Sequence, residues 1–339
     1  QGLTRQAGHR AKGVMTDEKA PDVNDRHQAG TLPDSPAIGE FLSNDVPRVY
    51  TARDMLIAAF DPNDQAPRNQ GTSGHYRLDG ITGGLRPGEV WLVGADTSWG
   101  KSSFAVMVYD ENRKRGKRVL IVSAEDSLKT YGERLMCRRT AIPAAVLRSR
   151  RLDRGHRDAV AQAQHDAELA PAFIDAQGRT VEWLVPRVKA AIREHGFDVV
   201  VFDYIGAFEC RSQQEDRRNM TRYIGRTLTD VAKTSGVCGI IMSQLTLSDE
   251  EKVPGKYTIR DCKDLVHMSE VTLIGFRAPD DKHDHDIRKG DRVVSVAKCK
   301  NGPAGGKVKL SWNDTVACFE SEADPEQMRL DSLGAERYP

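Results

Sequence analysis

The sequence contains no apolar run that approaches the ~20 residues needed by a membrane-spanning helix, so we expect no membrane contact. Its six cysteines are scattered and form no C-x-x-C pair, which argues against a zinc or dithiol redox site and favours a reducing, cytoplasmic location. No apolar stretch with a cleavage site marks a secretory signal, although the chain starts at Gln1 and its true start is left open. The net charge of +1 does not argue for a strongly basic nucleic-acid binder, but it allows a small basic channel.

The remaining composition is typical of a globular protein, with 39% hydrophobic and 29% charged residues among 339. Residues 1–47 are polar without an apolar period, so we expect a disordered arm there. Residues 48–74 are expected to form an amphipathic linker helix, over residues 51–60, and a polar linker. The apolar face of this helix could dock on a partner subunit or on its own domain, and both alternatives stay open. Residues 75–319 form the main domain, and the acidic residues 320–339 a flexible tail.

Within the main domain, apolar strand candidates alternate with helical stretches. The predicted strands are 90–93, 119–122, 199–202, 239–242, 271–275, 293–297 and 308–312, and the predicted helices are 101–113, 128–140, 181–194 and 220–234. Continuous Val- and Ile-rich runs are typical of strands covered on both faces. The sequence therefore predicts an α/β fold with a mostly parallel, twisted sheet flanked by helices.

A phosphate-binding loop of the form A-x-x-x-x-G-K-S lies between the first of these strands and the first helix. Its backbone N–H groups and the start of the helix suit phosphate oxygens, while Lys101 would reach the β- and γ-phosphates and Ser102 would bind Mg²⁺. ATP and Mg²⁺ are therefore the expected cofactors. The predicted nucleotide contacts are Ala95, Asp96, Thr97, Ser98, Trp99, Gly100, Lys101, Ser102 and Ser103.

Hydrolysis needs carboxylates at the ends of neighbouring strands, to hold the metal and to orient water. Asp203 ends an apolar strand, which is the position expected of a residue that holds Mg²⁺ through water. Glu125 is placed to orient the nucleophilic water, and Asp126 is the competing choice. Gln244 ends a third strand, where its amide could sense the γ-phosphate.

These elements resemble the C-terminal motor domain of replicative DNA helicases of the DnaB type, over about residues 75–319. The motifs that carry the resemblance are Gly83-Gly-Leu-Arg-Pro-Gly-Glu89, the phosphate loop, Ser123-Ala-Glu125, Phe202-Asp-Tyr204, Ser243-Gln-Leu245 and, most specifically, Lys298-Cys-Lys-Asn-Gly-Pro-Ala-Gly305. The resemblance implies a RecA-like P-loop NTPase fold with a preceding linker helix. It also implies a hexameric ring that hydrolyses ATP at subunit interfaces, moves along single-stranded DNA in the 5'-3' sense and unwinds duplex.

The same resemblance assigns further residues. Lys298 matches a lysine that acts on the nucleotide of the adjacent subunit, and Lys300 stands where most members carry an arginine finger. Lysines at alternate positions are expected to project on one face of the strand. Arg134 matches a position near the nucleotide, with an exposed helix arginine as the alternative. The loop that grips DNA ends near the predicted DNA-binding residues Arg260, Asp261 and Lys263, the last in place of a small residue.

The N-terminal domain that usually precedes the linker helix does not occur in this sequence, nor does a primase module. Loading and primase recruitment are therefore expected to depend on a helicase loader, a primase or another separate partner. Two rival functions remain. One is a RecA- or RadA-like recombination ATPase, and the other is a nucleotide-gated ring that binds single strands with little motor activity.

Overall fold

The computed structural model describes residues 51–52, 55, 71–167, 170–211, 216–245, 263–279, 287–323 and 325. The chain divides into two units, residues 1–47 and 48–339. The predicted polar arm and most of the predicted linker helix lie outside the described residues. The elements of the fold belong to the second unit.

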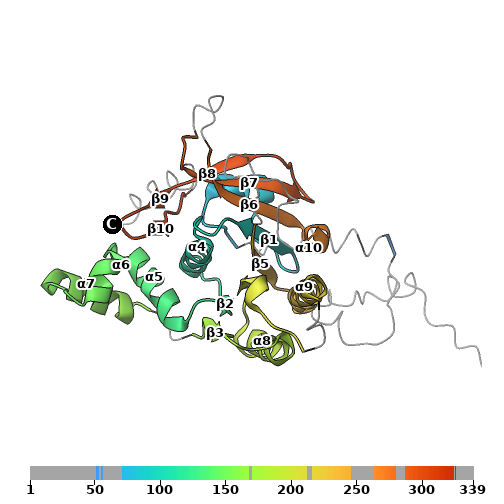
Figure 1. Cartoon of the computed structure of the whole chain (residues 1–339), viewed down its shortest axis with the longest axis horizontal. Helices are drawn as coiled ribbons and strands as arrows, with labels where there is room; N and C mark the ends of the chain where they lie inside the picture. Colours follow the sequence, from blue (N-terminus) through green and yellow to red (C-terminus); the bar gives the residue numbers. More distant parts are fainter. Residues whose placement is uncertain are drawn as a thin grey trace, which may run out of the picture. The chain divides into compact units, whose positions relative to one another are not determined.

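An eight-stranded sheet in the order β3-β2-β4-β5-β1-β6-β7-β8 forms the centre of this unit (Figure 1). Neighbouring strands from β3 to β6 are parallel, whereas β7 is antiparallel to both of its neighbours, β6 and β8. The predicted mostly parallel sheet is therefore confirmed. The strands are β1 Val90–Ala95, β2 Val119–Ser123, β3 Phe173–Asp175, β4 Val199–Asp203, β5 Cys238–Gln244, β6 Val271–Arg277, β7 Arg292–Cys299 and β8 Lys307–Leu310. A small antiparallel pair, β9 Trp312–Asn313 and β10 Cys318–Phe319, follows.

Helices cover both faces of this sheet, as the continuous apolar strands require. The helices are α3 Tyr76–Thr82, α4 Lys101–Lys114, α5 Leu128–Thr140, α6 Ala144–Ser149, α7 Arg154–His165, α8 Val181–His195, α9 Arg217–Thr234 and α10 Lys263–Met268, with the 3-10 turn η2 Ile205–Ala207. One core cluster contains residues of α3, α4 and α5, and the other contains residues of α8, α9 and α10. Figure 1 shows α4 and α5 on one side of the sheet and α8 and α9 on the other.

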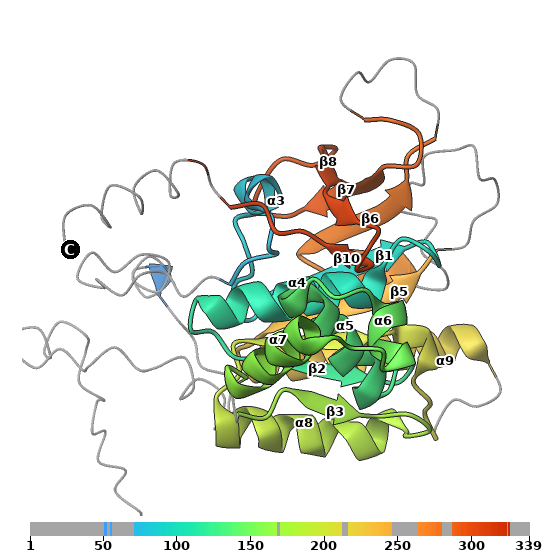
Figure 2. The same ribbon diagram turned by 90° about the vertical axis from the view of Figure 1, so that its left-hand side faces the viewer.

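The predicted helices and strands occur close to their expected bounds. The helix predicted over 128–140 is α5, and Gly196 ends α8 in the left-handed region, with φ 65°. The predicted strand 308–312 is interrupted at Ser311, which separates β8 from β9. The sequence pattern missed α6 and α7, which face the viewer in Figure 2 and have no buried residue. Both helices lie at the margin of the cores, and Ala144 and Leu147 of α6 pack only against the small cluster of Cys137, Val316 and Cys318.

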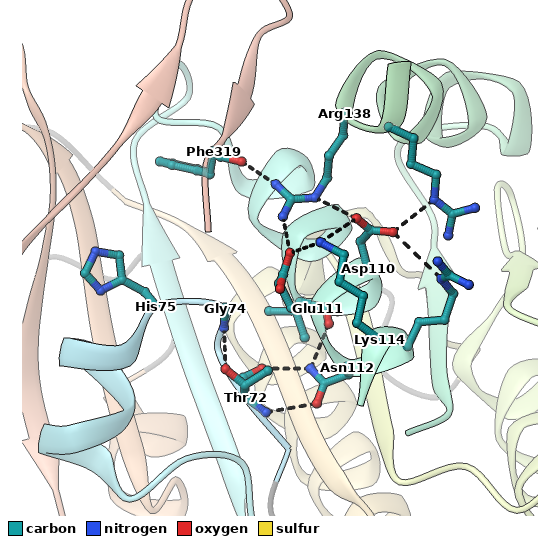
Figure 3. Close-up of polar contacts among 12 residues, drawn as sticks. Thr72, Gly74, His75, Asp110, Glu111, Asn112, Lys114, Arg138 and Phe319 are labelled. Atoms are coloured by element: carbon teal, nitrogen blue, oxygen red, sulfur yellow. Dashed lines mark hydrogen bonds and ion pairs between the residues drawn. The ribbon is translucent and has the colours of Figure 1, made fainter. Parts of the chain in front are cut away.

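A buried charged network fastens α4 to α5 (Figure 3). Arg138 donates from Nε to Asp110 at 3.1 Å and from Nη2 to Glu111 at 2.6 Å, and its Nη1 donates to the carbonyl of Phe319 in β10. Burial acts to raise the pKa of Asp110, but the hydrogen bond and charge of Arg139, with the charges of Lys114 and Arg138, outweigh it and lower the pKa. The helix that begins at the phosphate loop is therefore held firmly against α5 and β10.

Replacing Arg138 with alanine is expected to lower the free energy of unfolding by about 3 kcal/mol, because it leaves buried carboxylates short of their partner. Arg148 makes an exposed pair with Glu133 and is a matched control, so Arg148→Ala should leave the free energy of unfolding nearly unchanged. Urea unfolding of both variants measures the difference. Equal losses would show that the buried network does not stabilise the α4–α5 pair.

Two further contacts attach the segment before α3. The backbone N–H of Thr72 donates to Asn112 Oδ1 at 2.9 Å, and Asn112 Nδ2 donates to the Thr72 carbonyl at 2.7 Å (Figure 3). The backbone of Glu322 forms hydrogen bonds with the backbone of Gly74 and Tyr76, so the first residues of the predicted flexible tail pair with this segment.

Among the described residues, no helix is both long and apolar enough to cross a membrane.

Candidate active site

The phosphate loop joins the carboxyl end of β1 to the start of α4, as the sequence predicts. Gly100, the residue before α4, has φ 109°, a value that residues with a side chain rarely adopt. A Cβ at this position would also lie 3.0 Å from the Trp312 ring and 3.2 Å from Phe319. The loop therefore requires glycine here for its backbone shape and for its close packing on β9 and β10.

Trp99 turns away from the predicted nucleotide position. Its side chain is fully buried, its Nε1 donates to the Val293 carbonyl at 3.1 Å, and its ring packs against Phe319 at 4.8 Å between centroids. Gly275 allows this placement, because a Cβ there would lie 2.6 Å from the indole. Trp99 thus has only its backbone to offer a phosphate, while Thr97 and Ser98 are exposed.

Lys101 and Ser103 lie at the start of α4 with different surroundings. Lys101 is 7% exposed, and burial lowers its pKa against the opposing charges of Asp203 and Glu125. Its Nζ lies 3.5 Å from the Ala95 carbonyl, at the beginning of the loop. Ser103 donates instead to the Ala317 carbonyl at 3.0 Å, which turns its hydroxyl toward the β9–β10 turn. Of the two, only Lys101 presents its side chain to the carboxylates of the site.

Asp203 lies at the end of β4 and is fully buried. Its Oδ2 accepts hydrogen bonds from Ser102 Oγ, at 2.8 Å, and from the hydroxyl of Tyr131. Its Oδ1 is buried and has no hydrogen-bond partner within the described part of the chain. Burial raises the pKa of Asp203, against the two hydrogen bonds. A hydroxyl and a carboxylate with an unsatisfied buried oxygen are the oxygen donors that suit Mg²⁺, so the residues present fit that ion.

Glu125 follows β2, the strand beside β4, and Ala124 donates to the Asp203 carbonyl at 2.9 Å. Within the described residues the Glu125 carboxylate makes no hydrogen bond or ion pair, whereas Asp126 is paired with Arg134 at 2.6 Å. Burial and the nearby Asp203 raise the pKa of Glu125. The structure thus favours Glu125 over Asp126 as the carboxylate available for water, and it places Arg134 in an ion pair.

Gln244 ends β5 and pairs in register with Ala95, the first residue of the loop. Its backbone therefore lies beside the phosphate loop, between the ends of β1 and β4. Lys101, Ser102, Asp203, Glu125 and Gln244 all gather at the carboxyl edge of the parallel strands. Parallel strands end on the same side of a sheet, which explains why distant parts of the sequence meet there.

The two lysines predicted to act on a neighbour lie at the opposite edge of the sheet. β7 is antiparallel to β6, and Cys299 pairs with Val271, the first residue of β6. Val271 lies four residues, roughly 13 Å at the usual strand rise, from Gly275, which pairs with Ala95 at the start of the loop, and β7 is two strands away from β1. Neither Lys298 nor Lys300 can therefore reach the phosphate loop of its own chain.

Each of these lysines has partners within its own chain. A register shift in β7 leaves Ala297 as an additional residue, and Lys298 Nζ donates to the carbonyls of Val266 and His267, at 2.6 and 3.0 Å, at the end of α10. Lys300 lies beyond the end of β7 and pairs with Glu270 at 3.3 Å. Because β7 ends at Cys299, between the two lysines, their projection on one strand face stays a prediction.

The predicted DNA-binding residues are only partly within the structure. Arg260 and Asp261 lie outside the described residues, and Lys263 is the first residue of α10. α10 packs on α9, where a Cβ at Gly225 would lie 2.4 Å from Leu265, and Arg222 forms an ion pair with Asp264. The segment that follows the predicted DNA loop is thus attached to α9.

A pocket of about 400 Å³ lies near the phosphate loop, at the carboxyl edge of the parallel strands. No pattern in the sequence indicates this pocket. It is lined by Arg277, Gly290, Asp291, Arg292, Lys309, Leu310, Ser311, Trp312, Asp314 and Glu320. Arg292 stacks on Trp312 at 3.5 Å from the ring centroid and also donates to the Ser98 carbonyl of the loop. Burial lowers the pKa of Arg292 to about 10, so it stays charged at neutral pH.

The sequence model of the DnaB-like helicase C-terminal domain matches residues 71–321, which is well over half of the chain. This chain belongs to the DnaB-like helicase C-terminal domain family. The family implies nucleotide binding, in agreement with the phosphate loop, and it confirms the resemblance carried by the sequence motifs. Its matched range also includes Ser321, beyond the predicted domain end at residue 319.

Individual DnaB-like relatives agree with this assignment. The chain is 23% identical over 263 residues to the replicative DNA helicase DnaC of Bacillus subtilis (strain 168), covering 75% of this chain and 58% of the relative. It is 25% identical over 266 residues to the replicative DNA helicase DnaB of Geobacillus stearothermophilus, with the same coverage of 75% and 58%. The chain thus spans little more than half the length of the curated relatives it matches.

Two solved structures show the same fold. One is an isolated ATPase domain, which superposes with a TM-score of 0.70 at 23% identity, covering 81% of this chain and all of that domain. A structure named "The Structure Of A DnaB-Like Replicative Helicase And Its Interactions With Primase" gives a TM-score of 0.69 at 22% identity, covering 83% of this chain and 69% of that one. The predicted RecA-like fold is confirmed.

Proposed function

We propose that this chain is the motor of a ring-forming DNA helicase, which hydrolyses ATP at subunit interfaces to move along single-stranded DNA and unwind duplex. One observation carries the proposal. Glu125, Asp203 and Lys101 gather at one edge of the sheet, while Lys298 and Lys300 lie at the other. A site that needs both sets is complete only when two subunits meet, as in a closed ring.

Each residue at the carboxyl edge has a role in this proposal. Lys101 and the backbone of the loop hold the phosphates, and Ser102 and Asp203 hold Mg²⁺, the latter through water. Bound Mg²⁺ would neutralise charge that develops on the phosphate oxygens. Glu125 orients the attacking water. The Gln244 amide forms a hydrogen bond with the γ-phosphate and so couples its presence to the segment that follows β5. The neighbour's Lys298 and Lys300 stabilise the charge of the transferred phosphoryl group.

Lysine in place of arginine at position 300 affects how well the transferred phosphoryl group is stabilised. An ammonium supplies positive charge but lacks the planar fork of arginine, which can hold two oxygens at once. We therefore expect a lower hydrolysis rate in this ring than the same interface would give with arginine. The ion pair of Lys300 with Glu270 must also break before the ammonium can approach a phosphate.

For partners, we propose a hexamer on single-stranded DNA, with Arg260, Asp261 and Lys263 at the strand. Side-chain and backbone donors near these positions would bind phosphates without reading sequence. A helicase loader or a primase is a further proposed partner, and movement would run 5'-3'. We keep residues 75–319 as the motor domain, residues 48–74 as the linker, and the flanking segments as an arm and a tail.

The pocket beside the loop is suited to the base of the nucleotide. Its size falls within the range of small-molecule sites, and Arg277 and the guanidinium of Arg292, which Trp312 supports by stacking, offer planar surfaces to a base. Trp312→Ala is expected to weaken ATP binding about tenfold, since it removes the ring that supports this surface, and stacking contributes roughly 1–3 kcal/mol per base. Affinity for tripolyphosphate, which has no base, should stay unchanged.

Titrating both ligands against Trp312→Ala tests this placement. Trp183 in α8, where Arg187 stacks on it at 4.1 Å, provides a control far from the loop in sequence, and Trp183→Ala should bind both ligands normally. Equal weakening of ATP and tripolyphosphate by Trp312→Ala would contradict the base assignment. It would mean that Trp312 acts only by supporting Gly100.

A strand-displacement assay on forked DNA tests the function itself. Unwinding that depends on ATP, with a hexamer by native mass measurement in the presence of ATP and single-stranded DNA, is the expected result. ATP hydrolysis stimulated by single strands without unwinding or translocation would contradict the helicase proposal. It would favour the recombination ATPase or the nucleotide-gated ring instead.

A further inference from the structure

Tyr131 places a buried hydroxyl group at the proposed metal site, and no pattern in the sequence singled this residue out. It lies on α5, and its side chain is 4% exposed. Its hydroxyl donates to Asp203 Oδ2, and its ring packs against Phe173 in β3 at 5.3 Å between centroids. A phenol keeps its proton at neutral pH, so the hydroxyl acts as the donor in this hydrogen bond.

The hydrogen bonds to Asp203 are distributed unevenly between its two oxygens. Oδ2 accepts both hydroxyls, from Ser102 and Tyr131, while Oδ1 is buried and without a partner among the described residues. A carboxylate with one oxygen held by donors is fixed about its χ2 torsion, which otherwise rotates broadly. The free oxygen is thereby aimed in one direction, and a buried free oxygen of this kind needs a ligand.

The two donors are not equivalent. Ser102 is itself a proposed Mg²⁺ ligand, so its hydroxyl is needed elsewhere when the ion binds. Tyr131 has no such competing role, and it lies on a helix that is fixed at both ends. Ser127 caps the start of α5, and Arg138 fastens its last turns to Asp110 in α4. Tyr131 is therefore the donor that can hold Asp203 in place while Ser102 binds metal.

We propose that Tyr131 is a positioning residue for Mg²⁺, which holds Asp203 Oδ2 so that Oδ1 is directed at the water shell of the ion. The inference rests on the proposed function, because it concerns the same nucleotide site. It goes further in assigning to α5 a part in metal binding. Since Glu125 lies just before this helix, α5 also links the carboxylate at the water to the carboxylate at the metal.

The test is the Mg²⁺ dependence of nucleotide binding by the full chain with Tyr131→Phe, which keeps the ring and removes the hydroxyl. A fluorescent ATP analogue is titrated with MgCl₂, so no turnover is required. The Mg²⁺ concentration at half-saturation is expected to rise about tenfold, because the lost hydrogen bond is made to a charged carboxylate and such bonds are stronger than neutral ones. Affinity for the analogue in EDTA should be unchanged.

Two controls separate positioning from a merely structural role. Tyr223→Phe, on α9 and half-buried against the other core cluster, should leave the Mg²⁺ midpoint as it is. Tyr131→Phe in an Asp203→Asn background should add no further shift, since the hydroxyl acts through that carboxylate. An unchanged midpoint in Tyr131→Phe, or a full additional shift in the Asp203→Asn background, would overturn the proposal. Absence of Mg²⁺-dependent binding in the wild-type chain would instead contradict the proposed function.

Discussion

Glu125→Gln is expected to reduce ATP hydrolysis by about 10²–10⁴-fold, the usual contribution of a positioned base, while ATP binding is retained. The amide has the same shape as the carboxylate but cannot accept a proton from the attacking water. Lys101, Ser102 and the backbone of the loop remain in place, so the nucleotide keeps its phosphate contacts. Single-turnover hydrolysis and equilibrium binding of ATP, measured on the same preparation, check both halves of this prediction.

Asp126→Asn is the matched control, because the two carboxylates are adjacent in sequence. Asp126 is occupied by Arg134 at 2.6 Å, whereas the Glu125 side chain is exposed beside Lys101 and Asp203. We therefore expect Asp126→Asn to keep most of the hydrolysis rate. If Glu125→Gln keeps its turnover and Asp126→Asn loses it, the catalytic assignment passes to Asp126.

Lys300→Ala is expected to lower hydrolysis in assembled rings by about 10²-fold or more, while the nucleotide affinity of the monomer is nearly unchanged. An arginine finger contributes about 10³–10⁵ in rate, and a lysine without the planar fork should contribute less. The geometry gives the reason for the difference between ring and monomer, since Lys300 lies at the sheet edge remote from its own phosphate loop. Lys300→Arg should retain the rate or raise it.

Mixing two inactive variants tests whether Lys300 acts on a neighbour. In a mixture of Glu125→Gln and Lys300→Ala subunits, some interfaces combine an intact Glu125 from one subunit with an intact Lys300 from the other. Recovery of hydrolysis on mixing is expected, and its absence in rings shown to exchange subunits would place Lys300 in its own chain's site. Lys233→Ala serves as control, because Lys233 also pairs with Glu270, at 3.1 Å, without being predicted at the interface.

Much of the site could be predicted from the sequence because its elements are local. The apolar strands and the loop that follows β1 are contiguous segments, and their order alone predicts a parallel sheet. Once the strands are parallel, Glu125, Asp203 and Gln244 must lie at one edge. The sequence therefore determined the fold class, the phosphate loop and the edge at which its partners gather.

Only the tertiary structure decided which side chains meet. Tyr131 reaches Asp203 across 72 positions of sequence, and no local pattern distinguishes it from a core tyrosine. Trp99 lies within the phosphate loop, yet its ring enters the core because Gly275 leaves room for it. The antiparallel direction of β7 sends Lys298 and Lys300 to the far edge of the sheet. Spacing along a chain fixes which segments form strands and helices, but contacts between distant segments depend on strand direction, register and burial, which arise only when the sheet is assembled.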